Sequence, residues 1–128
     1  MSTIKCTNVE ALAGGGAPDN LLPITCSAWA NFNGSGVLSI RDSYNISSIT
    51  DNGTGDFSPN FAVAMANANY SVVASSKGSV GSGNNAGNRI MQLIYDSTTS
   101  GFEMISTQTA GATASDAELI YFQVFGGQ

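Results

Sequence analysis

From Cys26 onward, apolar and polar residues alternate over short segments that Gly, Asn, Asp and Ser separate. A period of two places successive side chains on opposite sides of a β-strand. Turn signals recur about every 8 to 12 residues, which is typical of sandwiches and barrels, and no segment has a helical stripe. The pattern predicts an all-β fold, a compact antiparallel β-sandwich (jelly-roll-like). Its strands are expected within residues 26–36, 37–46, 46–61, 60–65, 69–75, 89–107 and 117–128.

The first 25 residues differ from the rest of the chain, because they contain three consecutive glycines followed by Ala17-Pro18 and later Pro23. Glycine runs and X-Pro steps interrupt both helices and strands. We therefore predict an extended N-terminal arm over residues 1–25 and a β-sandwich domain over residues 26–128. The arm's leucines are expected to contact another subunit or the particle, unless the terminus is only partly ordered: Leu12, Leu21 and Leu22.

The last predicted strand is apolar on both faces. Ile120, Phe122 and Val124 share one face, and Leu119, Tyr121 and Phe125 occupy the other. A strand that is apolar on both sides is normally covered on both sides. In so small a domain we expect the second cover to be another subunit. The predicted subunit or particle contacts are therefore Leu119, Tyr121 and Phe125, together with Arg41, which is also a candidate for pairing across strands.

Residues 46–61 form either a metal-binding loop or a β-hairpin. Asp51 and Asp56 are too few carboxylates for a calcium loop, which supplies six to eight oxygens. Asn52-Gly53 between alternating segments is a strong hairpin signal. An odd number of loop residues, with a left-handed glycine, would keep Ile49 and Phe57 on one face. We predict a hairpin with its tip at Asn52-Gly53.

The surface is unusually poor in ions: 10% of the 128 residues are charged and the net charge is −5, against about 25% charged residues in ordinary domains. Such a surface loses little side-chain entropy when it is ordered against a partner, which favours an assembly component. The four basic residues are scattered, which argues against nucleic acid. No apolar run approaches a membrane span or a signal peptide.

Candidate chemistry is sparse. The chain has no histidine, so the commonest general base is missing. The carboxylates of Asp51 and Asp56 are expected to belong to turn residues. Those of Asp116 and Glu118 are expected to lie at a solvated strand end. Cys6 and Cys26 have no metal-motif spacing and form either a disulfide or two thiols. We predict no enzyme activity, no cofactor and no metal.

Residues 76–88 are predicted to form a long Gly/Asn/Ser loop. Binding residues concentrate on loops that rigid scaffolds carry. The candidates for receptor binding are therefore in or beside this loop, although a merely soluble connection is the favoured alternative: Lys77, Asn84, Asn85, Asn88 and Arg89.

Residues 29–73 carry the order W-A-N-F-N-G-S-G, then I-R, S-S-I-T-D-N-G-T-G-D, N-F and A-M-A-N-A-N-Y. In this order the chain resembles the recurring C-terminal domain of tailed-bacteriophage tail-fibre and virion-appendage proteins. Ala66 departs from the pattern, since relatives often have proline after the methionine. The resemblance implies a virion component, a homotrimer at the outer surface of a phage, made in the host cytoplasm.

The expected function is a bacteriophage virion structural protein, a trimeric appendage that contacts a host glycan or protein through its loops. In this interpretation Trp29 and Phe32 are core residues, and the partners are further copies and other virion proteins. The alternatives are a capsid decoration, cement or head-fibre protein without receptor binding, and a monomeric carbohydrate-binding module. The sequence leaves open the host, the receptor and the position on the particle.

Overall fold

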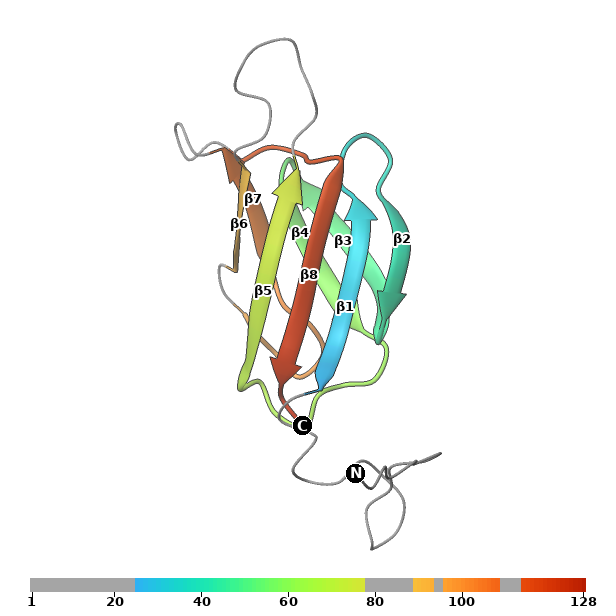
Figure 1. Cartoon of the computed structure of the whole chain (residues 1–128), viewed down its shortest axis with the longest axis vertical. Helices are drawn as coiled ribbons and strands as arrows, with labels where there is room; N and C mark the ends of the chain where they lie inside the picture. The colour runs from blue at the N-terminus through green and yellow to red at the C-terminus, as the bar shows by residue number, and fades with distance from the viewer. Residues whose placement is uncertain (1–24, 78–88, 94–95, 109–113) are drawn as a thin grey trace, which may run out of the picture.

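The computed structural model describes residues 25–77, 89–93, 96–108 and 114–128. These ranges contain no helix that is long and apolar enough to cross a membrane. Eight strands lie in them (Figure 1): β1 (Cys26–Asn33), β2 (Ser39–Tyr44), β3 (Ile46–Gly53), β4 (Asp56–Phe61), β5 (Tyr70–Lys77), β6 (Arg89–Leu93), β7 (Met104–Gln108) and β8 (Leu119–Gly126).

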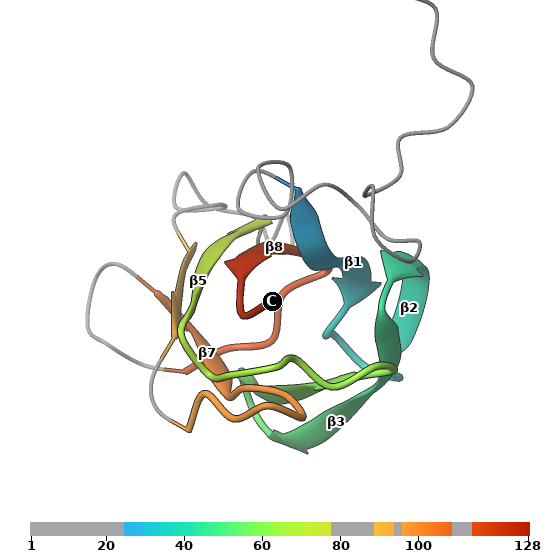
Figure 2. The ribbon, with the colours of Figure 1, turned by 90° about the horizontal axis from the view of Figure 1, so that it is seen from below.

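Hydrogen bonds join the strands in the order β2-β1-β8-β5-β6-β7-β4-β3, and every neighbouring pair is antiparallel. The β2-β1-β8-β5 half packs against the β6-β7-β4-β3 half (Figure 2). The predicted all-β, compact antiparallel sandwich is therefore confirmed. The first and last strands, β1 and β8, are neighbours, and β2 lies outside β1 at the edge. Of the predicted arm, residues 1–24 lie outside the described residues.

Aromatic side chains from both halves fill the space between them. Phe32 of β1, Phe57 of β4 and Phe122 of β8 are at most 1% exposed. The ring of Phe32 meets Phe57 edge to face, with 5.3 Å between centroids, and Phe102 meets Phe122 at 5.1 Å. Such contacts place the positive ring edge against the negative ring face. Alternate positions of distant strands thus build one core.

The predicted hairpin is present as β3-β4, and Ile49 and Phe57 both belong to the core, as expected. The tip lies two residues later than predicted, because the turn is formed by residues 54 and 55. A bulge after Asp51 adds one residue to β3, so five residues (52–56) separate Asp51 from its partner Phe57. The odd offset that the core requires comes from a two-residue turn combined with a bulge.

Gly55 lies where the hairpin tip meets the chain that leads into β8. Its φ is 70°, the left-handed region that we predicted for a glycine of this loop. A Cβ on Gly55 would lie 2.6 Å from the backbone nitrogen of Ser115 and 2.7 Å from the carbonyl oxygen of Ser106. Its N–H donates to the Asp116 carboxylate at 2.7 Å. Both the conformation and the space at this position therefore require glycine.

The chain turns at Asn45, so the strand predicted within residues 37–46 is present as β2 but ends at Tyr44, and Ile46 begins β3. Asn45 has a φ of 54°, which Asn tolerates better than most residues. Its side-chain amide donates to the carbonyls of Ser27 and Val63, at 3.1 and 3.2 Å, and accepts from the Val63 N–H at 2.7 Å. Val63 is thereby taken out of any strand. The separate strand predicted over residues 60–65 is therefore wrong, because Asn60 and Phe61 are the last two residues of β4 and residues 62–65 lie in no strand.

A second aromatic group gathers around Tyr70, the first residue of β5. Its ring lies 5.6 Å from that of Phe61 and 6.3 Å from that of Phe102. The hydroxyl donates to the carbonyls of Gly101 and Thr98, at 2.8 and 3.1 Å. Burial raises the pKa of Tyr70 because it disfavours the phenolate, although hydrogen bonds to Ser97 and Thr98 oppose the shift. This contact joins the start of β5 to the 96–102 segment.

Candidate binding face

The outward side of β2-β1-β8-β5 carries a regular array of side chains. In an antiparallel pair, residues directly opposite each other share a face, with Cβ atoms about 4.5–5.5 Å apart. The strand register therefore sets two outward rows across four strands. We call these eight residues the aromatic face: Tyr44, Trp29, Gln123 and Val73 in one row, and Asp42, Asn31, Tyr121 and Ser75 in the other.

Trp29 belongs to the aromatic face, so its predicted place in the core is wrong. Its side chain is half-buried, whereas Phe32 is fully buried as predicted. The two residues are three positions apart, and strand alternation puts them on opposite sides of the sheet. The inward positions of β1 are instead occupied by Ala28, Ala30 and Phe32.

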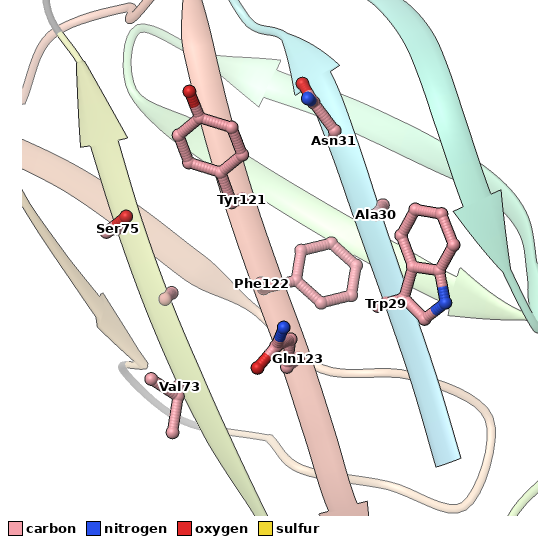
Figure 3. Close-up of a pocket in the computed structure, with 9 residues that line it drawn as sticks. Trp29, Ala30, Asn31, Val73, Ser75, Tyr121, Phe122 and Gln123 are labelled. Atoms are coloured by element: carbon pink, nitrogen blue, oxygen red, sulfur yellow. The ribbon is translucent and has the colours of Figure 1, made fainter. Parts of the chain in front are cut away.

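A shallow groove of about 390 Å³ lies on the aromatic face, over β1, β8 and β5. The indole of Trp29 and the phenol of Tyr121 project from neighbouring strands, with Asn31 and Gln123 beside them (Figure 3). Trp29 and Tyr121 are diagonal neighbours, a relation in which the two Cα atoms are about 7–8 Å apart. The groove's volume is at the lower end of the range for small-molecule sites, about 300–1,000 Å³.

Because side chains alternate along β8, the side chains that could contact a ligand point outward. Ile120, Phe122 and Val124 are at most 1% exposed and point into the core, while Tyr121 is 38% exposed. Gln123 is the next outward residue and is exposed. A tyrosine and a glutamine therefore occupy the centre of the outer face, between Trp29 on one side and Val73 on the other.

The polar groups of the groove have open hydrogen-bonding capacity. Within the described residues, the side chains of Trp29, Tyr121, Gln123 and Ser75 take part in no hydrogen bond with the protein. Asn31 is oriented by Arg41, whose Nη1 donates to Asn31 Oδ1 at 3.3 Å. The amides, the phenol and the hydroxyl can each donate and accept, and the indole N–H can donate. The groove thus presents several unused donors and acceptors between two aromatic rings.

Charged groups lie at the margins of the described part of this face. Arg41 lies on β2, the edge strand of this face, and its Nη2 donates to the Glu118 carbonyl at 2.7 Å. Asp42 is at the same end, and its carboxylate accepts from the Ser43 N–H at 2.9 Å. Lys77 ends β5, opposite Leu119. The centre of the groove is consequently uncharged.

The outward side of β3-β4 has a different character. Asn60 donates to Ser48 Oγ and Thr50 Oγ1, both at 3.2 Å. Asn52 donates to Ser58 Oγ at 2.7 Å and to Asp56 Oδ1 at 3.2 Å. We call this surface the polar face, and define it by six side chains: Ser48, Thr50, Asn52, Asp56, Ser58 and Asn60. On this surface the side-chain amides of Asn52 and Asn60 already donate to neighbouring side chains.

The predicted site residues fall into several places. Of the loop candidates, Lys77 is the last residue of β5 and Arg89 the first of β6, while Asn84, Asn85 and Asn88 lie outside the described residues. Of the predicted contact residues, Leu12, Leu21 and Leu22 also lie outside them. Leu119 and Phe125 are half-buried near the two ends of β8, and Tyr121 lies between them on the aromatic face.

Three carboxylates of the two candidate pairs accept hydrogen bonds from the backbone or from a neighbouring side chain: Asp51, Asp56 and Asp116. Asp51 Oδ1 accepts from the Gly53 N–H at 3.0 Å, as expected of a turn residue. Asp116 and Glu118 precede β8 and do not lie on a strand, contrary to the prediction. No group of three or more His, Cys, Asp or Glu side chains able to hold a metal occurs in the described ranges. Cys26 is a free, half-buried thiol, and Cys6 lies outside those ranges.

Sequence reasoning missed the aromatic face as a candidate binding surface because it needs strand pairings that one sequence does not reveal. The two-sided apolar pattern of β8 was a signal, but it pointed to Tyr121 only as a subunit contact. Gln123 and Asn31 carried no signal of their own. No protein-family model matches this chain, and the comparisons with curated proteins and with solved structures found no match either.

Proposed function

We propose that this chain is a bacteriophage virion protein, a trimeric surface-appendage domain that acts by binding and catalyses no reaction. The resemblance of residues 29–73 to tail-fibre and appendage domains supports the virion origin. The low charge of the surface, with 10% charged residues, supports a role in an assembly.

The aromatic face is the observation that carries the binding role. Exposed patches that combine apolar rings with polar groups mark interaction sites. Tyr44 is 57% exposed and Tyr121 is 38% exposed, and Trp29 lies between their strands. In this proposal the contact surface of the appendage includes the strands β1, β8 and β5, while the loop candidates of residues 76–88 stay a prediction.

Immunogold electron microscopy of the phage that encodes this chain tests the virion role. An antibody raised against the purified protein should label intact particles at the tail or at the capsid surface, and the label should be absent from debris of uninfected host cells. Particles that never carry gold would overturn the proposal.

Light scattering after size-exclusion chromatography tests the trimer. The expected mass is about 39 kDa, three times the 13.1 kDa of one chain. A stable monomer at micromolar concentration would remove the trimer from the proposal. Binding of purified protein to host cells, compared with binding to particles stripped of it, then distinguishes a receptor-binding appendage from a cement protein.

A further inference from the structure

We infer that the groove of the aromatic face binds an uncharged oligosaccharide, with Trp29 and Tyr121 as stacking platforms and Asn31 and Gln123 as hydrogen-bonding groups. The inference rests on the proposed function, since it names the class of receptor that the appendage would contact. It locates the glycan contact on the outer surface of β1-β8-β5, beside the loop contacts that the sequence predicts.

The two aromatic rings provide the apolar part of the site. A pyranose ring has an apolar face of C–H bonds, which packs well on a flat aromatic ring that is already held in place. Trp29 lies opposite Tyr44 and Gln123 on the adjacent strands and is half-buried, so its side chain has less conformational freedom to lose on binding than a fully exposed one. Tyr121 lies diagonally across on β8. Two platforms at this spacing fit successive sugars of a chain better than a single sugar.

The open amides provide the polar part of the site. Sugar hydroxyls both donate and accept, and Asn and Gln side chains offer both functions from one group. Gln123 has no partner within the described residues, and Asn31 is pre-oriented by Arg41 at 3.3 Å with its NH₂ group still available. A ligand without hydroxyl or amide groups would leave these groups desolvated and unpaired, at a cost in affinity.

The charge distribution selects an uncharged ligand. The middle of the groove has no ionised side chain, and Asp42 and Arg41 lie together at one margin. A polyanion such as a nucleic acid needs a continuous basic track, and the described face has none. The net charge of −5 also disfavours an acidic polymer.

The size of the groove argues for a glycan over a second copy of the chain. Nine residues line the groove, whereas a stable protein interface uses about 20–30 residues on each side. The surface is also concave, and a two-fold or three-fold contact would need a projecting partner surface that fits it. A short oligosaccharide fills a groove of about 390 Å³ without any such requirement.

The experiment uses the single tryptophan of the chain, Trp29, as its reporter. The full chain is first screened on an array of neutral α- and β-linked glucans, galactans and mannans, with heparin and polygalacturonate as charged probes. Each positive neutral hexasaccharide is then titrated in solution while tryptophan emission is recorded. We expect a saturable blue shift, because a stacked sugar removes water from the indole. The charged polymers should give no saturable shift.

Variants locate the site. Trp29→Ala and Tyr121→Ala should each weaken glycan binding, measured by calorimetry, about tenfold or more, and Gln123→Ala should weaken it severalfold. Asn60→Ala on the polar face is the matched control and should leave affinity within twofold of wild type. Circular dichroism checks that each variant is folded. If Tyr121→Ala does not fold, Tyr121→Phe is measured in its place, because it keeps the ring and removes only the hydroxyl.

Each outcome supports or overturns the inference. If no neutral glycan gives a saturable signal, it is wrong, and gold-labelled particles would show that the proposed function survives without it. If glycans bind but Trp29→Ala and Tyr121→Ala leave affinity unchanged, the site lies elsewhere. If these two variants lower the mass found by light scattering and not the affinity, the face is a subunit contact. If the purified protein binds a neutral glycan but particles never carry the gold label, the proposed function is wrong and the glycan inference stands.

Discussion

The two outward surfaces of this sandwich are built from the same kind of strand and differ in whether their polar groups are already used. On the polar face, Asn60 reaches two hydroxyls at 3.2 Å and Asn52 reaches Ser58 at 2.7 Å. On the aromatic face, Gln123 and Tyr121 have no partner within the described residues. A surface whose amides are satisfied by neighbours gains little from a ligand, because binding would only exchange one hydrogen bond for another.

The rings complete the contrast. The polar face is defined by short, mostly uncharged polar side chains with no aromatic group among them, whereas the aromatic face has Tyr44, Trp29 and Tyr121 in two adjacent rows. Rigid aromatic side chains bring a large contact area for little loss of conformational entropy. Of these two described surfaces, the aromatic face is therefore the one whose side chains favour ligand binding.

The largest effect is expected at β8, where adjacent residues belong to opposite environments. Phe122 is 1% exposed and touches Phe32 and Phe102, so Phe122→Ala should lower the free energy of unfolding by about 3–5 kcal/mol. Tyr121→Ala should cost less than about half of that, because Tyr121 is 38% exposed. Urea denaturation of both variants measures the difference, and equal losses would contradict the assignment of the two faces.

The next effect is expected at the tip of the polar-face hairpin. Gly55 and Gly36 both have a φ of 70°, but only Gly55 is crowded by backbone atoms, at 2.6 and 2.7 Å. Gly55→Ala should cost about 3 kcal/mol, from backbone strain and overpacking together.

Gly36→Ala is the matched control, since it meets the same φ with no atom within 4 Å of the added carbon. It should cost only about 1 kcal/mol, for the left-handed conformation alone. Thermal unfolding of both proteins separates the conformational part from the steric part. Similar losses in the two variants would mean that the hairpin tip does not pack against Ser106 and Ser115.

Much of the fold could be predicted from the sequence, because the strongest signals are local. The alternation in 70–77 and 119–126 defines β5 and β8, and the need to bury both Ile49 and Phe57 fixed the odd offset of the hairpin. Irregular features were harder. The left-handed turn at Asn45 depends on hydrogen bonds to Ser27 and Val63 that no local pattern announces.

The binding face was less accessible to sequence reasoning than the fold. Trp29 and Phe32 looked equivalent as aromatic residues of one strand, and only the alternation of β1 separates the surface residue from the core residue. The groove joins Asn31 to Tyr121 and Tyr121 to Ser75, which requires β8 to lie between β1 and β5. Such long-range neighbours follow from topology, which a single sequence does not contain.

A smaller effect on stability is expected for Trp29→Ala, in contrast to its expected effect on ligand binding. The half-buried ring covers part of β1 and β8, so its removal should cost about 1–2 kcal/mol, roughly half the value for a fully buried aromatic ring. The melting temperature without glycan measures this. A loss as large as that of Phe122→Ala would place the indole in the core and remove it from the binding face.

The smallest effect is expected for Asn60→Ala on the polar face. The Asn60 amide donates to Ser48 Oγ, Thr50 Oγ1 and the Ser58 carbonyl, at 3.1–3.2 Å. Because these acceptors can bond to water instead, the loss should be about 1 kcal/mol. Asn69→Ala, the same change at an exposed position directly before β5, should stay within about 0.5 kcal/mol of wild type. Urea denaturation of the two variants tests whether the Asn60 hydrogen bonds on the polar face contribute to stability. A change in glycan affinity in Asn60→Ala, at unchanged fold, would show that the two faces are not independent.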